Sequence, residues 1–287
     1  MKDVIIIGHG PAAVSAALYL RRAQKSVALI GRDMGALQKA EKIENYFGLP
    51  VPVSGIELAK TGLSQAKNLG AEIISAEVFD ITYDGDFLLT SSVGEHRAKA
   101  VILATGAARK APAISGLKEF EGRGVSYCAV CDAFFYRGKT VGVLGSGEFA
   151  LHELSHLLNV CEKAYLLTNG APAPESLPEK TTAITEPIAE IVGENVVTAV
   201  KLKGGEEIAL SGVFVAQGSA AAADFARKMG IEVANGSIVV DNDMKTAIDG
   251  VFAAGDCTGG FLQVATAVSE GAKAAMSALA FLKKGAS

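Results

Sequence analysis

The sequence predicts an α/β protein with two Rossmann-like, three-layer ββα domains, one of them discontinuous and carrying the other as an insertion. Three observations lead to this fold class. A short apolar run enters a glycine-rich turn twice, at residues 8–13 and 145–150. A helical segment rich in alanine or leucine follows each turn. A later strand at 251–256 leads into a final helix at 263–284, and we assign both to the first domain.

Length and composition agree with a well-packed globular protein. The chain has 287 residues, 49% of them hydrophobic and 20% charged, which suggests two domains. The net charge is −4 and no long basic run occurs, so nucleic acid is not an expected partner. The first apolar run is too short for a signal peptide or a membrane span. Four cysteines with one close pair favour a reducing compartment, and we expect a cytoplasmic protein.

The first glycine-rich turn has the form of a dinucleotide site. A strand at 4–7 enters Gly8-His9-Gly10-Pro11-Ala12-Ala13, and a helix to about residue 22 and a strand at 26–30 follow. Glycines permit the tight turn and a close approach of the backbone, and the helix N-terminus receives a pyrophosphate. The second strand ends in Gly31-Arg32 where an acidic residue usually binds a ribose. Arg32 is therefore expected to meet the adenosine by stacking or by a phosphate contact.

The remainder of the first domain supplies further backbone turns. We expect a helix at 54–68, strands of a small antiparallel sheet over 71–103, and core packing for Tyr46 and Phe47. A strand at 101–104 closes on Thr105-Gly106, which lets the backbone pass close to a dinucleotide. The strand at 251–256 ends in Gly255-Asp256, where the carboxylate can accept hydrogen bonds from ribityl hydroxyls. The predicted domains are 1–111 with 241–287, and 112–240.

The pair Cys128 and Cys131, followed at once by Asp132, is the candidate reactive centre. Two cysteines at this spacing can close a disulfide, and Asp132 can pass a proton to or from a departing thiolate. Zinc and a buried inert pair are the alternatives. Zinc needs two further ligands, and the remaining cysteines, Cys161 and Cys257, are isolated in the sequence.

The second domain repeats the strand, turn and helix pattern. A strand at 140–144 enters the second glycine-rich turn, and three further strands form a meander over 182–210. The helix contains His152-Glu153-Leu154-Ser155-His156, a short motif that also occurs in zinc proteases. The apolar positions of this helix place the two histidines on the other face, and a helix is already expected after the turn. We therefore predict no metal site.

The end of the strand at 163–168 bears on nicotinamide binding. NADPH needs a basic side chain there for its 2′-phosphate, and NADH needs a carboxylate for the ribose. No lysine, arginine or histidine occurs from Ala164 to Glu179, and the first acidic residue is Glu175. Glu148 also places a negative charge where a phosphate would sit. The fold of a nicotinamide domain is expected without its binding chemistry.

Taken together, these motifs resemble the low-molecular-weight thioredoxin reductases over nearly the whole chain. The shared segments are GHGPAA, Gln38, IENYFG, the ATG at 104–106, GRGVSYCAVCDAFFYRGK, and GVFAAGD with Gln263 behind it. The resemblance implies FAD in the first domain, a redox-active Cys128–Cys131 pair in the second, and a homodimer. It implies that Cys131 faces the flavin, that Cys128 attacks the disulfide of thioredoxin, and that Asp132 is the acid/base. The residues it assigns to FAD are Gly8, Gly10, Pro11, Ala12, Ala13, Gly31, Arg32, Gln38, Asn45, Thr105, Gly106, Gly255, Asp256, Gln263 and Val264.

One departure from that family concerns the electron donor. NADPH-dependent members carry a basic HRR-type stretch where this chain has LLTNGAP. The ferredoxin-dependent flavin thioredoxin reductases of clostridia lack that stretch, and the chain is similar to this subgroup. The resemblance therefore implies thioredoxin and ferredoxin as partners. Three alternatives stay open: an NADPH-dependent thioredoxin reductase with an atypical nucleotide site, a diflavin-linked disulfide oxidoreductase, and a flavin redox sensor that does not turn over.

Overall fold

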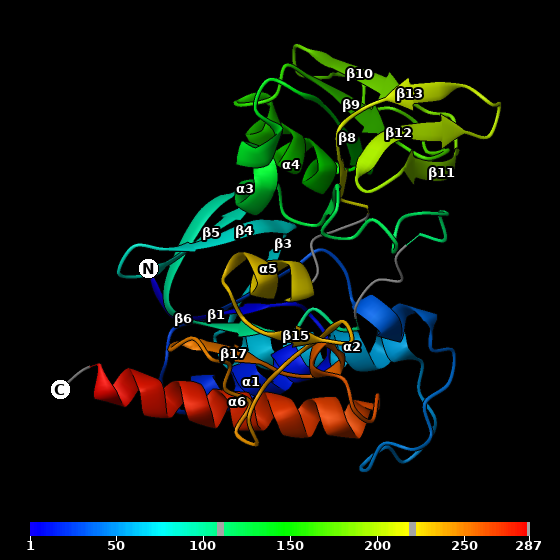
Figure 1. Cartoon of the computed structure of the whole chain (residues 1–287). Coiled ribbons are helices and arrows are strands. Elements are labelled where there is room, and N and C mark those ends of the chain that lie inside the picture. Colours follow the sequence, from blue (N-terminus) through cyan, green and yellow to red (C-terminus); the bar gives the residue numbers. More distant parts are fainter. Residues whose placement is uncertain (108–111, 218–221, 286–287) are drawn as a thin grey trace. The chain divides into compact units, whose positions relative to one another are not determined.

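The computed structural model describes residues 1–107, 112–217 and 222–285 (Figure 1). Its contacts divide the chain into unit 1, Met1–Arg109 with Ala221–Ser287, and unit 2, Lys110–Ala220. Unit 1 is thus discontinuous and unit 2 is inserted into it, as the fold class predicts. The second boundary differs from the predicted one. Unit 1 resumes at residue 221, whereas the predicted first domain resumes at 241, so residues 221–240 belong to unit 1.

Helix α5 (Ala222–Lys228) explains that difference. At its start, the Ala222 N–H donates to Thr105 Oγ1 at 2.9 Å, and at its end Lys228 Nζ lies 3.6 Å from the Asp80 carboxylate. Both partners belong to unit 1. These contacts join residues more than a hundred positions apart, so no local pattern in the sequence predicts them.

Unit 1 is built on a seven-stranded sheet. Its order is β3-β2-β1-β6-β5-β4, with β17 also paired to β6. The strands β1, β2, β3, β6 and β17 pair in parallel, whereas β4 and β5 are antiparallel. The strand bounds are β1 Lys2–Ile7, β2 Val27–Gly31, β3 Glu72–Ser75, β4 Val78–Tyr83, β5 Phe87–Ser91, β6 Gly94–Leu103 and β17 Val251–Ala253.

Two details of this sheet differ from the expected separate antiparallel sheet over 71–103. Strand β3 pairs in parallel with β2, not with β4. Strand β6 is long enough to serve both parts of the sheet, because its first half pairs with β5 and its second half with β1. Its buried apolar half, from Ala98 on, is the half that joins the parallel strands.

Helices α1 (Pro11–Arg22) and α6 (Val264–Lys284) run side by side next to the sheet of unit 1 (Figure 1). They approach closely at Gly271, where a Cβ atom would overlap the carbonyl oxygen of Ala12. Both helices bury mainly alanine against the strands. The remaining elements of unit 1 are η1 Gly35–Lys39, α2 Gly55–Asn68, β15 Val233–Ala234, β16 Ser237–Ile238 and η3 Asp256–Thr258.

Unit 2 has a five-stranded parallel sheet and a three-stranded antiparallel sheet. The orders are β10-β9-β8-β14-β7 and β11-β12-β13. A buried aliphatic cluster that includes Leu144, Leu167 and Val200 joins the two sheets. The bounds are β7 Val125–Ser126, α3 Ala129–Asp132, η2 Ala133–Tyr136, β8 Thr140–Leu144, α4 Glu148–Leu158, β9 Lys163–Leu167, β10 Thr181–Ile184, β11 Ile188–Gly193, β12 Val197–Leu202, β13 Glu207–Ala209 and β14 Val213–Val215.

The expected core packing of the aromatic pair at 46–47 is half right. Tyr46 packs against a small cluster with Leu37 and Ile43. Phe47, by contrast, is 98% exposed, so the prediction for this residue is wrong. Among the described helices, none combines the length and the apolar character that crossing a membrane requires.

Candidate active site and cofactor site

The Cys128–Cys131 pair forms a disulfide at the start of the short helix α3. Cys128 is the N-cap residue, and the Cys131 N–H points at Cys128 Sγ from 3.1 Å. A backbone N–H directed at this sulfur favours its thiolate once the disulfide opens. The two other cysteines, Cys161 and Cys257, are buried free thiols. The pair is therefore a redox-type disulfide, as the spacing predicts.

The two sulfur-bearing residues differ in exposure. Cys128 is only 5% exposed, whereas Cys131 is an exposed residue. Apolar side chains surround this part of the surface: Val130 lies between the cysteines, and Phe134 and Phe135 follow them with 69% and 70% of their surface exposed. Exposed apolar groups of this size next to a reactive disulfide favour a protein as reaction partner over a small molecule.

Ser126, at the end of β7, organises the polar side of the disulfide turn. Its hydroxyl donates to Asp132 Oδ2 at 2.6 Å and accepts the N–H of Cys128 at 3.1 Å. The Asp132 carboxylate is half-buried, and its backbone N–H donates to the Cys128 carbonyl. This places Asp132 on the same turn as both cysteines, where proton transfer to or from a sulfur is possible. The catalytic roles of the three residues stay a prediction.

A buried carboxylate holds the start of α3 in place. Glu153, on α4, is 2% exposed and its Oε2 accepts the N–H of Ala129 at 2.8 Å. A four-residue helix makes almost no hydrogen bonds of its own, so this contact satisfies an N–H that would otherwise be orphaned. The glutamate of the His-Glu-x-x-His motif therefore supports the disulfide turn, which removes it from the role of a protease general base.

In unit 1, four strand ends that lead into polar or glycine turns meet at one edge. Ile7 of β1 pairs with Ile30 of β2 and with Leu103 of β6, and Leu103 pairs with Ala253 of β17. Because these strands are parallel, their carboxyl ends line up. Ligands of open α/β sheets bind outside such an edge, where the chain order reverses. The turns that the sequence assigns to the cofactor are therefore together in the fold.

The first of these turns has the geometry of an anion site. Gly8 has φ +128°, and a Cβ atom there would overlap the Ala104 carbonyl oxygen. Gly10 caps α1 without a side-chain hydrogen bond, and a Cβ atom there would have no neighbour within 4 Å apart from the adjacent residues of the chain. Pro11 occupies the first helical position, and the first turn has no acidic residue. The N–H groups of Ala12 and Ala13 thus begin a helix whose positive end is not neutralised by the chain.

Strand β17 delivers Asp256 to the same edge. Gly255 has φ +81°, and its N–H donates to Glu270 Oε2 at 2.7 Å, which the Thr258 hydroxyl also reaches at 3.1 Å. Burial raises the pKa of the Asp256 carboxyl above its usual range. A carboxylate in this setting gains from ligand hydroxyls that donate to it. Glu270 was not predicted, and it fixes the turn from the neighbouring helix α6.

The remaining predicted cofactor residues lie on loops of unit 1. Asn45 Nδ2 donates to Gln263 Oε1 at 2.9 Å, and Gln263 is the N-cap residue of α6, directly before Val264. Gln38 is exposed on η1. Gly106 has φ +79°, and Thr105 binds α5 as described above. At the end of β2, Gly31 passes the His9 ring, and Arg32 is exposed beside Asp33 and Glu77.

The corresponding edge of unit 2 has the same backbone turn with different chemistry. Gly145 is crowded by the Ala216 carbonyl as Gly8 is by Ala104, and Gly147 caps α4 without a side-chain hydrogen bond. The first turn of α4, however, contains the exposed carboxylate of Glu148. This negative charge occupies the helix end where a nucleotide phosphate would need a positive field.

The end of β9 is occupied by its own loop. The Thr168 hydroxyl donates to the Ala171 carbonyl, and Asn169 Oδ1 accepts the Ile188 N–H at 2.8 Å. Lys180 precedes β10, whose first residue pairs with Ala164 near the start of β9. Lys180 therefore lies at the amino end of the parallel strands, opposite to the edge where a nucleotide binds. Arg227, on α5, belongs to unit 1.

Comparison with known proteins defines the class to which this fold and disulfide belong. Residues 2–271 match the pyridine nucleotide-disulphide oxidoreductase family, and the chain is a member of this family of flavoprotein disulfide oxidoreductases. Within it the chain groups with the thioredoxin reductases. It is 39% identical to the thioredoxin reductase of Aquifex aeolicus, an alignment that covers 98% of this chain and 93% of the relative.

Two solved structures are informative neighbours. An atypical thioredoxin reductase from Desulfovibrio vulgaris Hildenborough has a TM-score of 0.93 and 38% identity, with 99% of each chain covered. A ferredoxin-flavin thioredoxin reductase from Clostridium acetobutylicum has a TM-score of 0.77 and 34% identity, with 99% of this chain and 98% of that chain covered. Both alignments include residues of unit 1 and of unit 2.

The family binds FAD, and the residues of unit 1 fit that cofactor. The glycine turn before α1 offers a pyrophosphate the uncapped N–H groups of a helix without acidic residues in its first turn. Asp256, whose charged form is disfavoured by burial, offers an acceptor for ribityl hydroxyls. Close backbone approach at Gly8 leaves no room for a side chain, and the positive φ of Gly106 is a conformation that other residues rarely adopt. The individual assignments of residues to parts of FAD stay predictions.

Proposed function

We propose that this protein reduces thioredoxin with electrons that come from a one-electron carrier, reduced ferredoxin, and not from NADPH or NADH. Bound FAD supplies the chemistry that joins the two kinds of carrier, because flavins take up electrons singly and pass them on in pairs. Thioredoxin as the substrate rests on membership of the thioredoxin reductases. The donor rests on what the nucleotide edge of unit 2 contains.

The observation that carries the choice of donor is the end of β9 together with Glu148. The polar side chains there, Thr168 and Asn169, are bound within their own loop, and no basic side chain occurs from Ala164 to Glu179. Charge-assisted contacts to a phosphate contribute about 1.5–3 kcal/mol each. Losing two or three of them weakens nicotinamide binding by several powers of ten. The likeness to a ferredoxin-flavin thioredoxin reductase supports the same donor.

The residues of unit 2 then carry out the second half of the reaction. Two electrons and two protons convert the Cys128–Cys131 disulfide into two thiols. One thiolate attacks the disulfide of thioredoxin and forms a mixed disulfide, and the second thiol displaces reduced thioredoxin and restores the starting pair. Asp132 holds or releases the proton of the departing sulfur. Val130, Phe134 and Phe135 provide the apolar surface on which a protein substrate can rest.

The test is anaerobic reduction of the FAD-loaded protein with each donor in turn. We expect the flavin absorbance to stay unchanged with millimolar NADPH or NADH and to bleach fully with reduced ferredoxin. Adding oxidised thioredoxin should then restore the absorbance repeatedly in the native protein and not in Cys131→Ser. Fast bleaching by micromolar NADPH would instead support an NADPH-dependent enzyme. Bleaching by ferredoxin without turnover of thioredoxin would support a redox sensor.

A further inference from the structure

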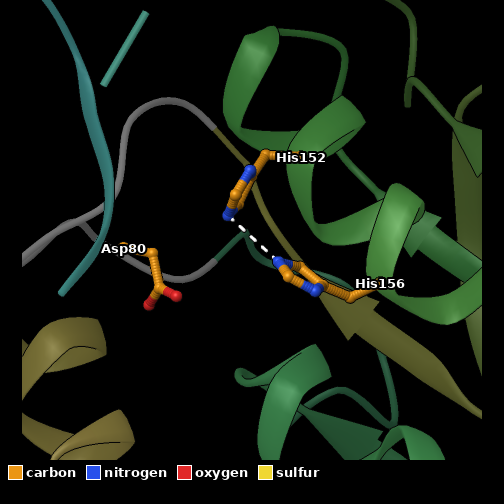
Figure 2. Close-up of side chains that lie close together, drawn as sticks. All are labelled: Asp80, His152 and His156. Carbon is orange, nitrogen blue, oxygen red and sulfur yellow. Dashed lines mark hydrogen bonds between the residues drawn. The ribbon is translucent and has the colours of Figure 1, made fainter. Parts of the chain in front are cut away.

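Helix α4 brings two histidine side chains together on one face. His152 and His156 are four residues apart, one helical turn, and both are half-buried (Figure 2). Their Nε2 atoms are 3.2 Å apart, with ring centroids 4.7 Å apart and ring planes at 83°. The hydrogen-bond-length contact between the two rings thus joins ring nitrogens, and each can offer a lone pair to a metal in the tautomer that carries its proton on Nδ1.

This separation is the one that a chelated metal ion requires. Zinc bonds to imidazole nitrogen at 2.0–2.1 Å, and two ligands of a tetrahedral ion are then about 3.3 Å apart. The two Nε2 atoms are therefore already at the separation that an ion bound to both would need. Without an ion, the same distance suits an N–H···N hydrogen bond, which keeps the two nitrogens close together.

The structure separates these histidines from the protease motif in which they occur. Glu153 points to the Ala129 N–H, where its carboxylate supports the disulfide turn. It is therefore not available as a general base beside the imidazoles. The prediction of no metal site rests on the apolar positions of the helix, which place both histidines on its other face, and on a helix being expected after the turn. Neither reason excludes a pair of histidines that chelates an ion without the glutamate.

We propose that His152 and His156 bind one divalent ion of borderline softness, Zn²⁺ or Cu²⁺, through their Nε2 atoms. Water completes the coordination of an ion that has only two protein ligands from α4. Imidazole selects Cu²⁺ and Zn²⁺, in that order of affinity, and rejects Mg²⁺, which prefers oxygen ligands. Asp80, also drawn in Figure 2, belongs to unit 1, where Lys228 Nζ lies 3.6 Å from its carboxylate, and the site proposed here consists of the two histidines of unit 2 alone.

The first experiment measures Zn²⁺ binding to the untagged, FAD-loaded protein by calorimetry after removal of metal with a chelator. The disulfide is kept oxidised, so that its sulfurs cannot act as ligands. We expect one Zn²⁺ per chain, no binding of Mg²⁺, and a loss of Zn²⁺ affinity of at least tenfold in His152→Gln and in His156→Gln. His96→Gln is the matched control, because His96 is half-buried and hydrogen-bonded to Ser91 elsewhere in the chain. The Zn²⁺ affinity of this variant should stay within twofold of the native value.

Electron paramagnetic resonance of bound Cu²⁺ identifies the ligands directly. Coupling to two nitrogens is expected in the native protein, and coupling to fewer in each of the two glutamine variants. Thermal melting without metal shows whether the variants fold. An absence of Zn²⁺ binding in the native protein, unchanged affinity in the variants, or a loss of affinity in only one of them would overturn the proposal.

Discussion

The Ser126 hydroxyl lies 2.6 Å from Asp132 Oδ2 and simultaneously accepts the N–H of Cys128. One side chain thus links the candidate acid/base to the backbone of the first cysteine. The hydroxyl has one proton and two acceptors in reach, the Asp132 carboxylate at 2.6 Å and the Cys128 carbonyl at 3.3 Å. The nearer, charged carboxylate is the stronger acceptor, so the proton goes to Asp132. Ser126 is therefore a positioning residue for Asp132, and its removal has a specific expected effect.

Ser126→Ala should lower thioredoxin turnover by about tenfold, because general acid–base catalysis contributes 10²–10⁴-fold and depends on position. Ser126→Thr keeps the hydroxyl and should retain most of the rate. In Asp132→Asn, the further change Ser126→Ala should have little additional effect, since the two residues act as one unit. Steady-state turnover of the four variants measures this. Independent, additive losses would contradict a positioning role.

The roles predicted for the two cysteines can be separated by trapping. Cys131→Ser leaves Cys128 free to attack, and we expect it to form a stable mixed disulfide with a single-cysteine thioredoxin, its resolving cysteine replaced by serine, whose remaining thiol has first been converted to its 5-thio-2-nitrobenzoate disulfide, with release of thionitrobenzoate. Cys128→Ser should not form this adduct. Non-reducing electrophoresis detects it. The opposite result would reverse the roles, and it would agree with the exposure of Cys131 and the burial of Cys128.

The four cysteines should divide into two classes on alkylation. Burial raises the pKa of the Cys161 thiol, and it raises that of Cys257 to about 12. At pH 8 a thiol with that pKa is thiolate only about one time in 10⁴. Iodoacetamide should therefore add two groups to the reduced native protein and four to the protein in urea, counted by intact mass. Modification of Cys161 or Cys257 without denaturant would show that these thiols are accessible and reactive.

His9 should make the protein less stable in mild acid. Its side chain is 7% exposed, and burial lowers the pKa of its imidazole below 6.5. The unfolded chain therefore takes up a proton first as the pH falls through 6.5, and stability is lost below that pH at up to about 1.4 kcal/mol per pH unit. The urea midpoint should fall less between pH 7.5 and 5.5 in His9→Gln than in the native protein. His96→Gln serves as the control, and equal slopes in all three would exclude His9 as the cause.

Features with a local signal were predictable from the sequence. Strand ends, both glycine turns and the cysteine spacing are visible as short patterns, because backbone conformation at a glycine turn depends on neighbouring residues. The disulfide between Cys128 and Cys131 and the uncapped start of α1 agree with these patterns. The predicted burial of Phe47 was wrong because the identity of an aromatic residue in a loop does not show whether its side chain is buried or exposed.

The residues that support the site could not be predicted because most of them contact residues far away in the sequence. Glu153 reaches Ala129 across 24 positions, and Glu270 reaches Gly255 across 15. Ser126 is close to Asp132 in the chain, yet a serine before a reactive turn is too common to indicate its role. The position of α5 in unit 1 depends on Ala222 and Lys228 meeting partners more than a hundred residues away. Such contacts follow from the packing of whole elements, which no short pattern contains.

The loop after β9 also limits how the electron donor of this protein can be re-engineered. Asn169 has φ +52°, a conformation that asparagine tolerates well, and its amide oxygen holds the Ile188 N–H. An arginine at this position would add one charge and at the same time lose the hydrogen bond and strain the turn, at about 1 kcal/mol for each. A variant with this single substitution would therefore lose stability before it gained a complete site for a nucleotide phosphate. Exchanging the whole segment 168–174 together with Glu148 is the shorter route, because it replaces the loop and its charge in one step.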